Sequence, residues 1–269
     1  MKMFRWFCSW IVILCYSSVS FAQETVDCSA LIDRPTVFFV NGMYTDRKPA
    51  ERIVEDLKES YFSFLASLPN QDYLTDEMRC VEFRVAHNQK EEAWLDLLEA
   101  FVQSLSDDTV TFWHWVARTH GFPVPEWFKE KQLEISKAIS SAFAYVIDED
   151  LRKHVDVYAG MLGSRMVVAH SQGNYYATQA NLLLPAYLRI PAFAVATPEG
   201  SEPDRGYLTY ANDTVINAVR GITGALPANA EGNCEEDWSC HGMREVYLQT
   251  DRRLIAWTIF TTLFPPVPY

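Results

Sequence analysis

Short apolar runs alternate along the chain with segments of helical periodicity. The runs are rich in β-branched and aromatic residues and end at turn-forming residues, as buried strands do. Five runs are predicted strands: 36–42, 79–88, 165–171, 190–198 and 206–213. Three segments with apolar residues three or four positions apart are predicted helices: 49–66, 173–184 and 243–264. This alternation predicts an α/β fold with a mostly parallel sheet flanked by helices.

The stretch 88–162 is longer than a crossover between neighbouring strands requires. It contains "TFWHWVARTHGFPVPEWF", in which Trp and Phe surround two prolines, followed by residues with helical spacing. We therefore predict a helical and aromatic insert over about 88–162, before the third strand of the list. Two interpretations stay open. The aromatic residues either fill the core or form an apolar wall or lid over a binding site.

The first 22 residues have the pattern of a secretory signal peptide. Lys2 and Arg5 precede a short apolar run, and small residues lead up to Ala22. The run is shorter than the roughly 20 residues of a membrane-spanning helix, which argues against an uncleaved anchor. We predict cleavage after Ala22, a single mature domain over 23–269 without a stable membrane span, and a secreted or periplasmic location.

Cysteine content and charge agree with export and narrow the classes of partner. Four cysteines lie beyond the predicted leader, and an even number favours two disulfides, for which three pairings are possible. Proximity along the chain favours Cys234–Cys240, and Cys28–Cys80 would then be the second pair. A zinc site is the alternative, but it would call for closer Cys pairs. The formal net charge is −12 before the positive leader is removed, and so acidic a surface repels nucleic acid.

Candidate chemistry gathers just beyond the predicted strands. Asn41-Gly42, Ser171 and Asp213 each follow a predicted strand, and parallel sheets bind ligands at the carboxyl ends of their strands. Ser171 lies in "AHSQG", which matches the nucleophile motif G-x-S-x-G except that Ala169 replaces the first Gly. A strand–turn–helix of this kind exposes the serine, and the helix beginning at Gly173 would favour an oxyanion beside it.

The chain resembles the α/β-hydrolase family in "FFVNG", "AHSQG", "YANDTV" and "CHGM", which occur in the family's chain order over roughly residues 35–260. The resemblance implies that Ser171 is the nucleophile, Asp213 the acid and His241 the general base. It implies an oxyanion hole made by the backbone N–H groups of Met43 and Gln172. No metal or organic cofactor is expected.

The sequence departs from the family pattern in three places. Ala169 replaces Gly, Asn41 replaces the usual His before Gly42, and no clear strand lies between the acid and the histidine, which predicts a reduced sheet. Glu199 and then Asp237 are the alternatives to Asp213 as the acid. Among the histidines, His170 is expected to point away from the nucleophile, and the other four precede Ser171, contrary to the family order.

The function expected from this resemblance is that of a secreted serine esterase or lipase. Its partners would be small-molecule or lipid esters, with thioesters also possible. Four residues of the insert are candidates for substrate binding: Trp113, Trp115, Phe122 and Trp127. The same three catalytic residues would serve an acyltransferase or an amidase, and a non-catalytic binding protein could retain the fold.

Overall fold

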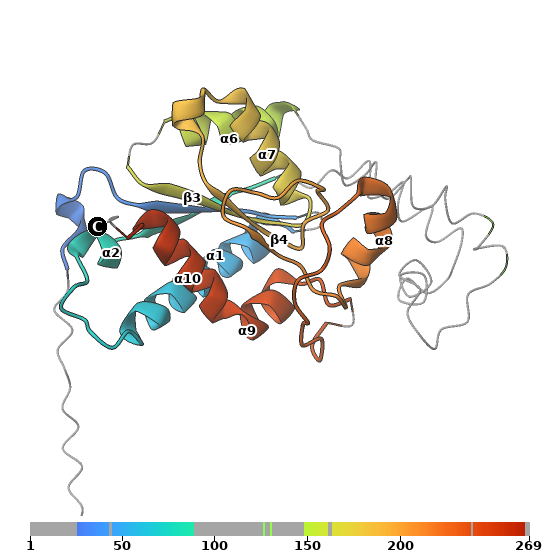
Figure 1. Ribbon diagram of the computed structural model, residues 1–269. Coiled ribbons are helices and arrows are strands. Elements are labelled where there is room, and N and C mark those ends of the chain that lie inside the picture. The colour runs from blue at the N-terminus through green and yellow to red at the C-terminus, as the bar shows by residue number, and fades with distance from the viewer. Residues whose placement is uncertain are drawn as a thin grey trace, which may run out of the picture.

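The computed structural model describes residues 26–42, 45–88, 126, 130, 148–160, 163–237 and 239–266. Its centre is a five-stranded sheet in which every strand pair is parallel, in the order β2-β1-β3-β4-β5 (Figure 1). The strands are β1 Thr36–Val40, β2 Glu82–Ala86, β3 Arg165–His170, β4 Ala192–Val195 and β5 Tyr207–Leu208. The predicted α/β architecture with a parallel sheet is confirmed.

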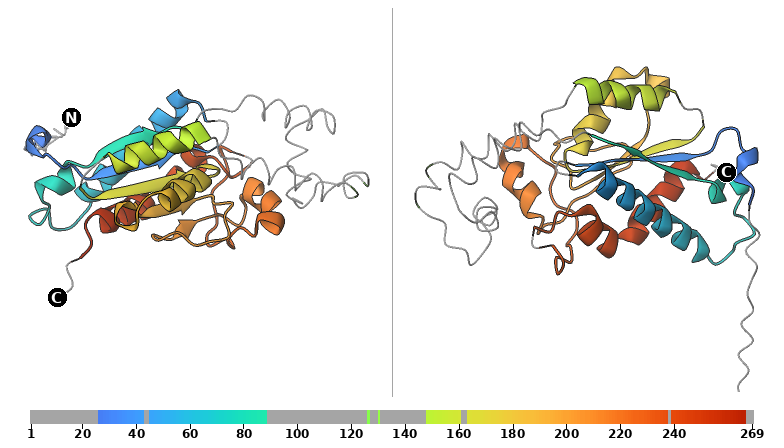
Figure 2. Two further views of the ribbon diagram at one scale, coloured as in Figure 1. Left: turned by 90° about the horizontal axis from the view of Figure 1, so that it is seen from above. Right: turned by 180° about the vertical axis from the view of Figure 1, so that it is seen from behind.

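Helices cover both faces of the sheet. α6 Asp148–Ala159 and α7 Gly173–Leu183 lie on one face, and α1 Arg47–Ala66 and α10 Arg252–Leu263 lie on the other (Figures 1 and 2). The apolar run of β1 explains this arrangement. Val37 and Phe39 pack into the core on the α1 side, whereas Phe38 and Val40 pack into the core on the α7 side. A strand buried on both faces therefore carries no polar alternation.

Shorter elements complete the described chain: η1 Cys28–Ala30, α2 Asp76–Arg79, η2 Ala186–Leu188, α8 Thr214–Thr223, the π-helical turn η3 Met243–Tyr247 and α9 Leu248–Thr250. Between α8 and η3, the described residues add no strand to the sheet. They form one isolated bridge, between Tyr210 and Ala230. This agrees with the sequence, which has no clear strand pattern between residues 213 and 241.

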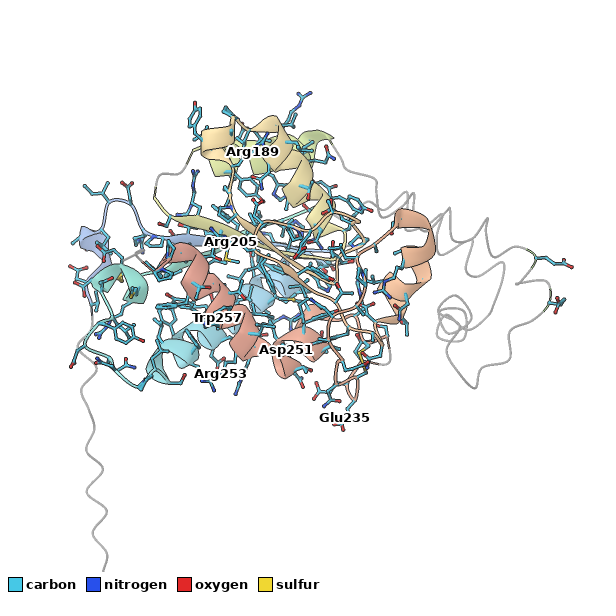
Figure 3. The ribbon with its side chains drawn as sticks, viewed as in Figure 1. Arg189, Arg205, Glu235, Asp251, Arg253 and Trp257 are labelled. Atoms are coloured by element: carbon cyan, nitrogen blue, oxygen red, sulfur yellow. A yellow bond between two sulfur atoms is a disulfide. The ribbon has the colours of Figure 1, made fainter. Side chains whose placement is uncertain are left out.

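Several predicted elements differ from the structure, and the strand predicted over 190–198 is shortened to β4. The strand predicted over 79–88 begins only at Glu82, because the Thr75 hydroxyl caps α2 just before it. The strand predicted over 206–213 is limited to β5, because the chain then turns toward α8. The single helix predicted over 243–264 is interrupted at Asp251, which lies between α9 and α10 (Figure 3).

The structure contains two disulfides, between the cysteine pairs predicted from the sequence. Cys28–Cys80 ties η1 to the C-cap residue of α2, and Cys234–Cys240 closes a short loop before η3. Both fit a protein that matures in an oxidising compartment.

Among the described residues, no helix is long and apolar enough to cross a membrane. The predicted leader, and the insert apart from residues 88, 126, 130 and 148–160, lie outside the described residues.

Candidate functional site

Ser171 lies in a tight turn between β3 and α7. Its φ angle is +56°, in the left-handed region, and its N–H donates to the Val195 carbonyl at 3.0 Å. At Gly173, the first residue of α7, a Cβ atom would lie 2.4 Å from the Val40 carbonyl oxygen, so a side chain there would push the start of the helix away from the end of β1. Ala169, in contrast, is an ordinary buried residue of β3, paired with β1 and β4. The turn therefore requires Gly at its second small position and accepts Ala at the first.

The loop that follows β1 packs directly on this turn. A Cβ atom on Gly42 would lie 2.6 Å from the Ser171 Cβ and 3.2 Å from the His170 carbonyl oxygen. No real side chain makes so close a contact, so the loop would have to move if Gly42 were replaced. The absence of a side chain at Gly42 is what lets the loop's backbone approach Ser171 closely.

The structure brings Ser171, His241 and Asp213 into one hydrogen-bonded chain. The His241 Nε2 lies 2.9 Å from the Ser171 Oγ, and its Nδ1 lies 2.9 Å from the Asp213 Oδ2. The Asp213 carboxylate can only accept, which favours the tautomer with the proton on Nδ1. In that tautomer Nε2 accepts the serine proton. The imidazole is therefore placed to act as a base toward Ser171.

Asp213 is fixed by its position at the start of α8. Its side chain is fully buried, and its Oδ1 accepts the Ile216 N–H at 2.9 Å as an N-cap. An N-cap carboxylate is held by the helix's first turn, and the positive end of the helix dipole favours its negative charge. The turn after β5 thus holds the carboxylate in place beside His241.

The loop that carries His241 is held by Asp237 and by the Cys234–Cys240 disulfide. The Asp237 carboxylate accepts the N–H groups of His241 at 3.1 Å and of Gly242 at 2.7 Å. Burial alone would raise the Asp237 pKa, but these bonds and those from Ser239 outweigh it and lower the pKa. Asp237 therefore shapes the loop's backbone. It does not contact the imidazole as Asp213 does.

Glu199, the first alternative acid, occupies a different environment. Its Oε2 accepts the hydroxyl of Thr178, a residue of α7, at 2.9 Å. Burial raises the pKa of its carboxyl group, and the bond from Thr178 offsets that only in part. Within the described chain, the carboxylate that contacts the His241 imidazole belongs to Asp213.

His170 supports the His241 loop, a role that the sequence did not reveal. Its Nε2 lies 2.8 Å from the His241 carbonyl oxygen, and the two rings pack with centroids 4.9 Å apart. Burial, reinforced by the neighbouring His241, lowers the His170 pKa to about 3. His170 is therefore neutral at ordinary pH, and its Nε2–H donates to the carbonyl oxygen.

A second set of buried polar residues holds the loop after β1. Asn41 accepts the Asn88 N–H at 2.9 Å, and Asn88 returns a bond to the Asn41 carbonyl at 2.6 Å. His154 of α6 contacts the Asn88 Oδ1 at 2.6 Å. Asn41 is thus part of a buried network. No motif in the sequence marks Asn88 or His154 as its partners.

Strained backbone is concentrated at this site. Among the described residues other than glycine, three have positive φ: Ser171 at +56°, Ala196 at +47° and Cys240 at +54°. Ser171 and Cys240 belong to the nucleophile turn and to the loop before His241, and Ala196 follows Val195, which accepts the Ser171 N–H. Such conformations cost free energy and persist mainly where a functional geometry needs them.

Of the remaining predicted site residues, the structure describes one, Gln172. Gln172 is the N-cap residue of α7, immediately after Ser171. Met43 and the four aromatic candidates Trp113, Trp115, Phe122 and Trp127 lie outside the described residues. Across the described ranges, no group of three or more His, Cys, Asp or Glu is arranged to hold a metal ion.

Comparison of the chain with protein-family models, with curated proteins and with solved structures finds no match.

Proposed function

We propose that this protein is a serine hydrolase that cleaves carboxylic esters through Ser171, His241 and Asp213. The observation that carries the proposal is the unbroken chain of hydrogen bonds from the serine hydroxyl through the imidazole to a buried carboxylate. A serine hydroxyl is a weak nucleophile until a base removes its proton, and the base must itself be oriented. The contact between His241 and Ser171 supplies the base, and the contact between Asp213 and His241 orients it.

In the proposed reaction, the Ser171 Oγ attacks the ester carbonyl while the His241 Nε2 takes the hydroxyl proton. Asp213 orients the ring and stabilises the imidazolium that forms. The N–H groups of Gln172 and Met43 would donate to the oxyanion of the tetrahedral intermediate. His241 then gives its proton to the leaving alcohol. A water molecule, deprotonated by His241, cleaves the acyl-enzyme and regenerates Ser171.

We further propose that the fold is a reduced member of the α/β-hydrolase type. The parallel strand order, the nucleophile turn after the central strand β3 and the order nucleophile, acid, histidine all support this. The aromatic part of the insert would supply the apolar contacts to an acyl chain. The two disulfides support export, in keeping with the leader proposed for residues 1–22.

A fluorophosphonate probe tests the proposal directly. The Ser171 Oγ should displace fluoride from the probe's phosphorus, and peptide mapping by mass spectrometry should find the adduct on Ser171. The same preparation should hydrolyse p-nitrophenyl esters, and a short-to-long acyl series would identify the preferred chain length. Heat-unfolded protein is the control, because activation of the serine depends on the folded site. An adduct confined to another residue would contradict the proposal.

Loss of the Cys234–Cys240 disulfide should lower kcat even in the protein that remains folded. The bridge restrains the loop that presents His241, and small displacements of a catalytic group can cost up to about 100-fold in rate. We expect a C234S/C240S variant to hydrolyse esters at least about tenfold more slowly at saturating substrate. The matched control is C28S/C80S, which removes a bridge far from the loop. Its folded fraction should turn over at the wild-type rate. Equal losses of kcat in the two variants would contradict the expectation.

A further inference from the structure

The Asp213 carboxylate has a third hydrogen-bond partner that the proposed reaction does not use. Besides the Ile216 N–H and the His241 imidazole, it accepts the Tyr247 hydroxyl, which lies 2.9 Å from Oδ2. Oδ2 is the same oxygen that lies 2.9 Å from the His241 Nδ1. Because the His241 Nδ1 lies 3.1 Å from Oδ1, the phenol bonds the nearer of the two oxygens that orient the imidazole.

The direction of the Tyr247 hydroxyl is set by its surroundings. The side chain is fully buried, and its oxygen accepts the backbone N–H of Tyr210 at 3.2 Å. A phenol has one proton to donate, so that proton is left for Asp213. Burial and the neighbouring Asp213 charge raise the pKa of the Tyr247 phenol well above its ordinary value, so the hydroxyl remains a neutral donor.

The Tyr247 ring is fixed by stacking and by the π-helical turn. It lies parallel to the Tyr210 ring, with centroids 4.2 Å apart and an interplanar angle of 3°. The Tyr210 hydroxyl is directed elsewhere, to the Asp251 Oδ2 at 2.6 Å. Within η3, both Val246 and Tyr247 donate their N–H groups to the Gly242 carbonyl. One short segment therefore carries both the imidazole and the phenol that meet at Asp213, and π-helical turns often occur at functional sites.

We infer that Tyr247 is a positioning residue that sets the orientation of the Asp213 carboxylate toward His241. This inference rests on the proposed function. Without the hydroxyl, Oδ2 would lose one of its two donors, and only the Ile216 N–H and the imidazole would restrain rotation of the carboxylate about its Cβ–Cγ bond. The imidazole would then spend less time aligned with the Ser171 Oγ. We expect substrate binding not to change, because the Tyr247 side chain is fully buried and its hydroxyl donates to Asp213.

The Y247F variant tests this inference, because it removes one oxygen atom and keeps the stacked ring. We expect kcat for ester hydrolysis to fall about 10- to 100-fold with KM within about twofold of wild type. Labelling by the fluorophosphonate should slow by a similar factor. The matched control is Y61F, which also removes a buried hydroxyl, one that donates from α1 to the Met78 carbonyl of α2. Y61F should have wild-type kcat, whatever its stability.

A double-mutant cycle distinguishes positioning from general destabilisation. Because Tyr247 acts through Asp213, adding Y247F to a D213N background should lower kcat no further. Replacing Tyr247 by 4-aminophenylalanine, which keeps a donor on the same ring, should restore much of the lost rate. Wild-type kcat in Y247F, or a full additional loss in the double variant, would overturn the inference.

Failure of the inference can be separated from failure of the proposed function. If wild-type protein is labelled at Ser171 but Y247F reacts equally fast, only the role of Tyr247 is wrong. If wild-type protein is not labelled, the proposed function fails, and the contact can still be tested without turnover. The His241 Nδ1 proton should give a low-field NMR signal that shifts in Y247F and is unchanged in Y61F. An unchanged signal in Y247F would overturn the inference.

Discussion

The S171A variant is expected to lose ester hydrolysis almost completely, with kcat lower by about 10⁴- to 10⁶-fold. The substitution removes the Oγ atom that lies 2.9 Å from the His241 Nε2 and adds nothing in its place. Without that atom no acyl-enzyme can form, and labelling by a fluorophosphonate should disappear as well. Initial rates with a p-nitrophenyl ester and gel-based labelling measure the two losses independently.

Folding has to be preserved for this result to identify the nucleophile. Alanine keeps the Cβ atom of Ser171, so its contact with Gly42 and the hydrogen bond from its N–H to Val195 can remain. Thermal unfolding should therefore stay close to that of wild type. S67A is the matched control, because Ser67 bonds the Phe64 carbonyl at the end of α1 and should leave both rate and labelling intact. Hydrolysis at the wild-type rate by S171A would exclude Ser171 as the nucleophile.

The fold was largely predictable because its strongest signals are local. Apolar runs such as "TVFFV" and "RMVVAH" match β1 and β3, and both are buried strands. The contact between Ser171 and His241 spans 70 residues, yet it followed from chain order in a family resemblance. The periodicity of apolar residues alone does not predict which distant residues come into contact. It also missed the break at Asp251, because apolar spacing continues across the interruption.

The supporting residues of the site could not be predicted, for a physical reason. Asn88 bonds Asn41 across 47 residues, and His170 bonds the His241 carbonyl across 71. Tyr247 reaches Asp213 from a predicted helix, where a tyrosine at that spacing indicates only a buried face. Their roles depend on which donor meets which acceptor after folding. Residue type and position along the chain do not fix that choice.

The D213N variant should lower kcat by about 10⁴-fold without unfolding the protein. Asparagine is as good an N-cap as aspartate, so its side-chain oxygen can still accept the Ile216 N–H and start α8. Its amide group would then face the His241 Nδ1 and the Tyr247 hydroxyl. An amide N–H requires an acceptor, so Nδ1 loses its proton and Nε2 gains it. In that tautomer Nε2 can no longer accept the proton of Ser171.

E199Q supplies the comparison that identifies the acid. Glutamine at this position can still accept the Thr178 hydroxyl, and because burial raises the Glu199 pKa, a neutral side chain fits its environment. We therefore expect kcat within about threefold of wild type for E199Q, against the large loss for D213N. The reverse outcome, an active D213N and an inactive E199Q, would assign the acid to Glu199. The hydrogen bond between Asp213 and His241 would then serve the structure of the loop, and the imidazole would have to turn toward α7 to meet a different carboxylate.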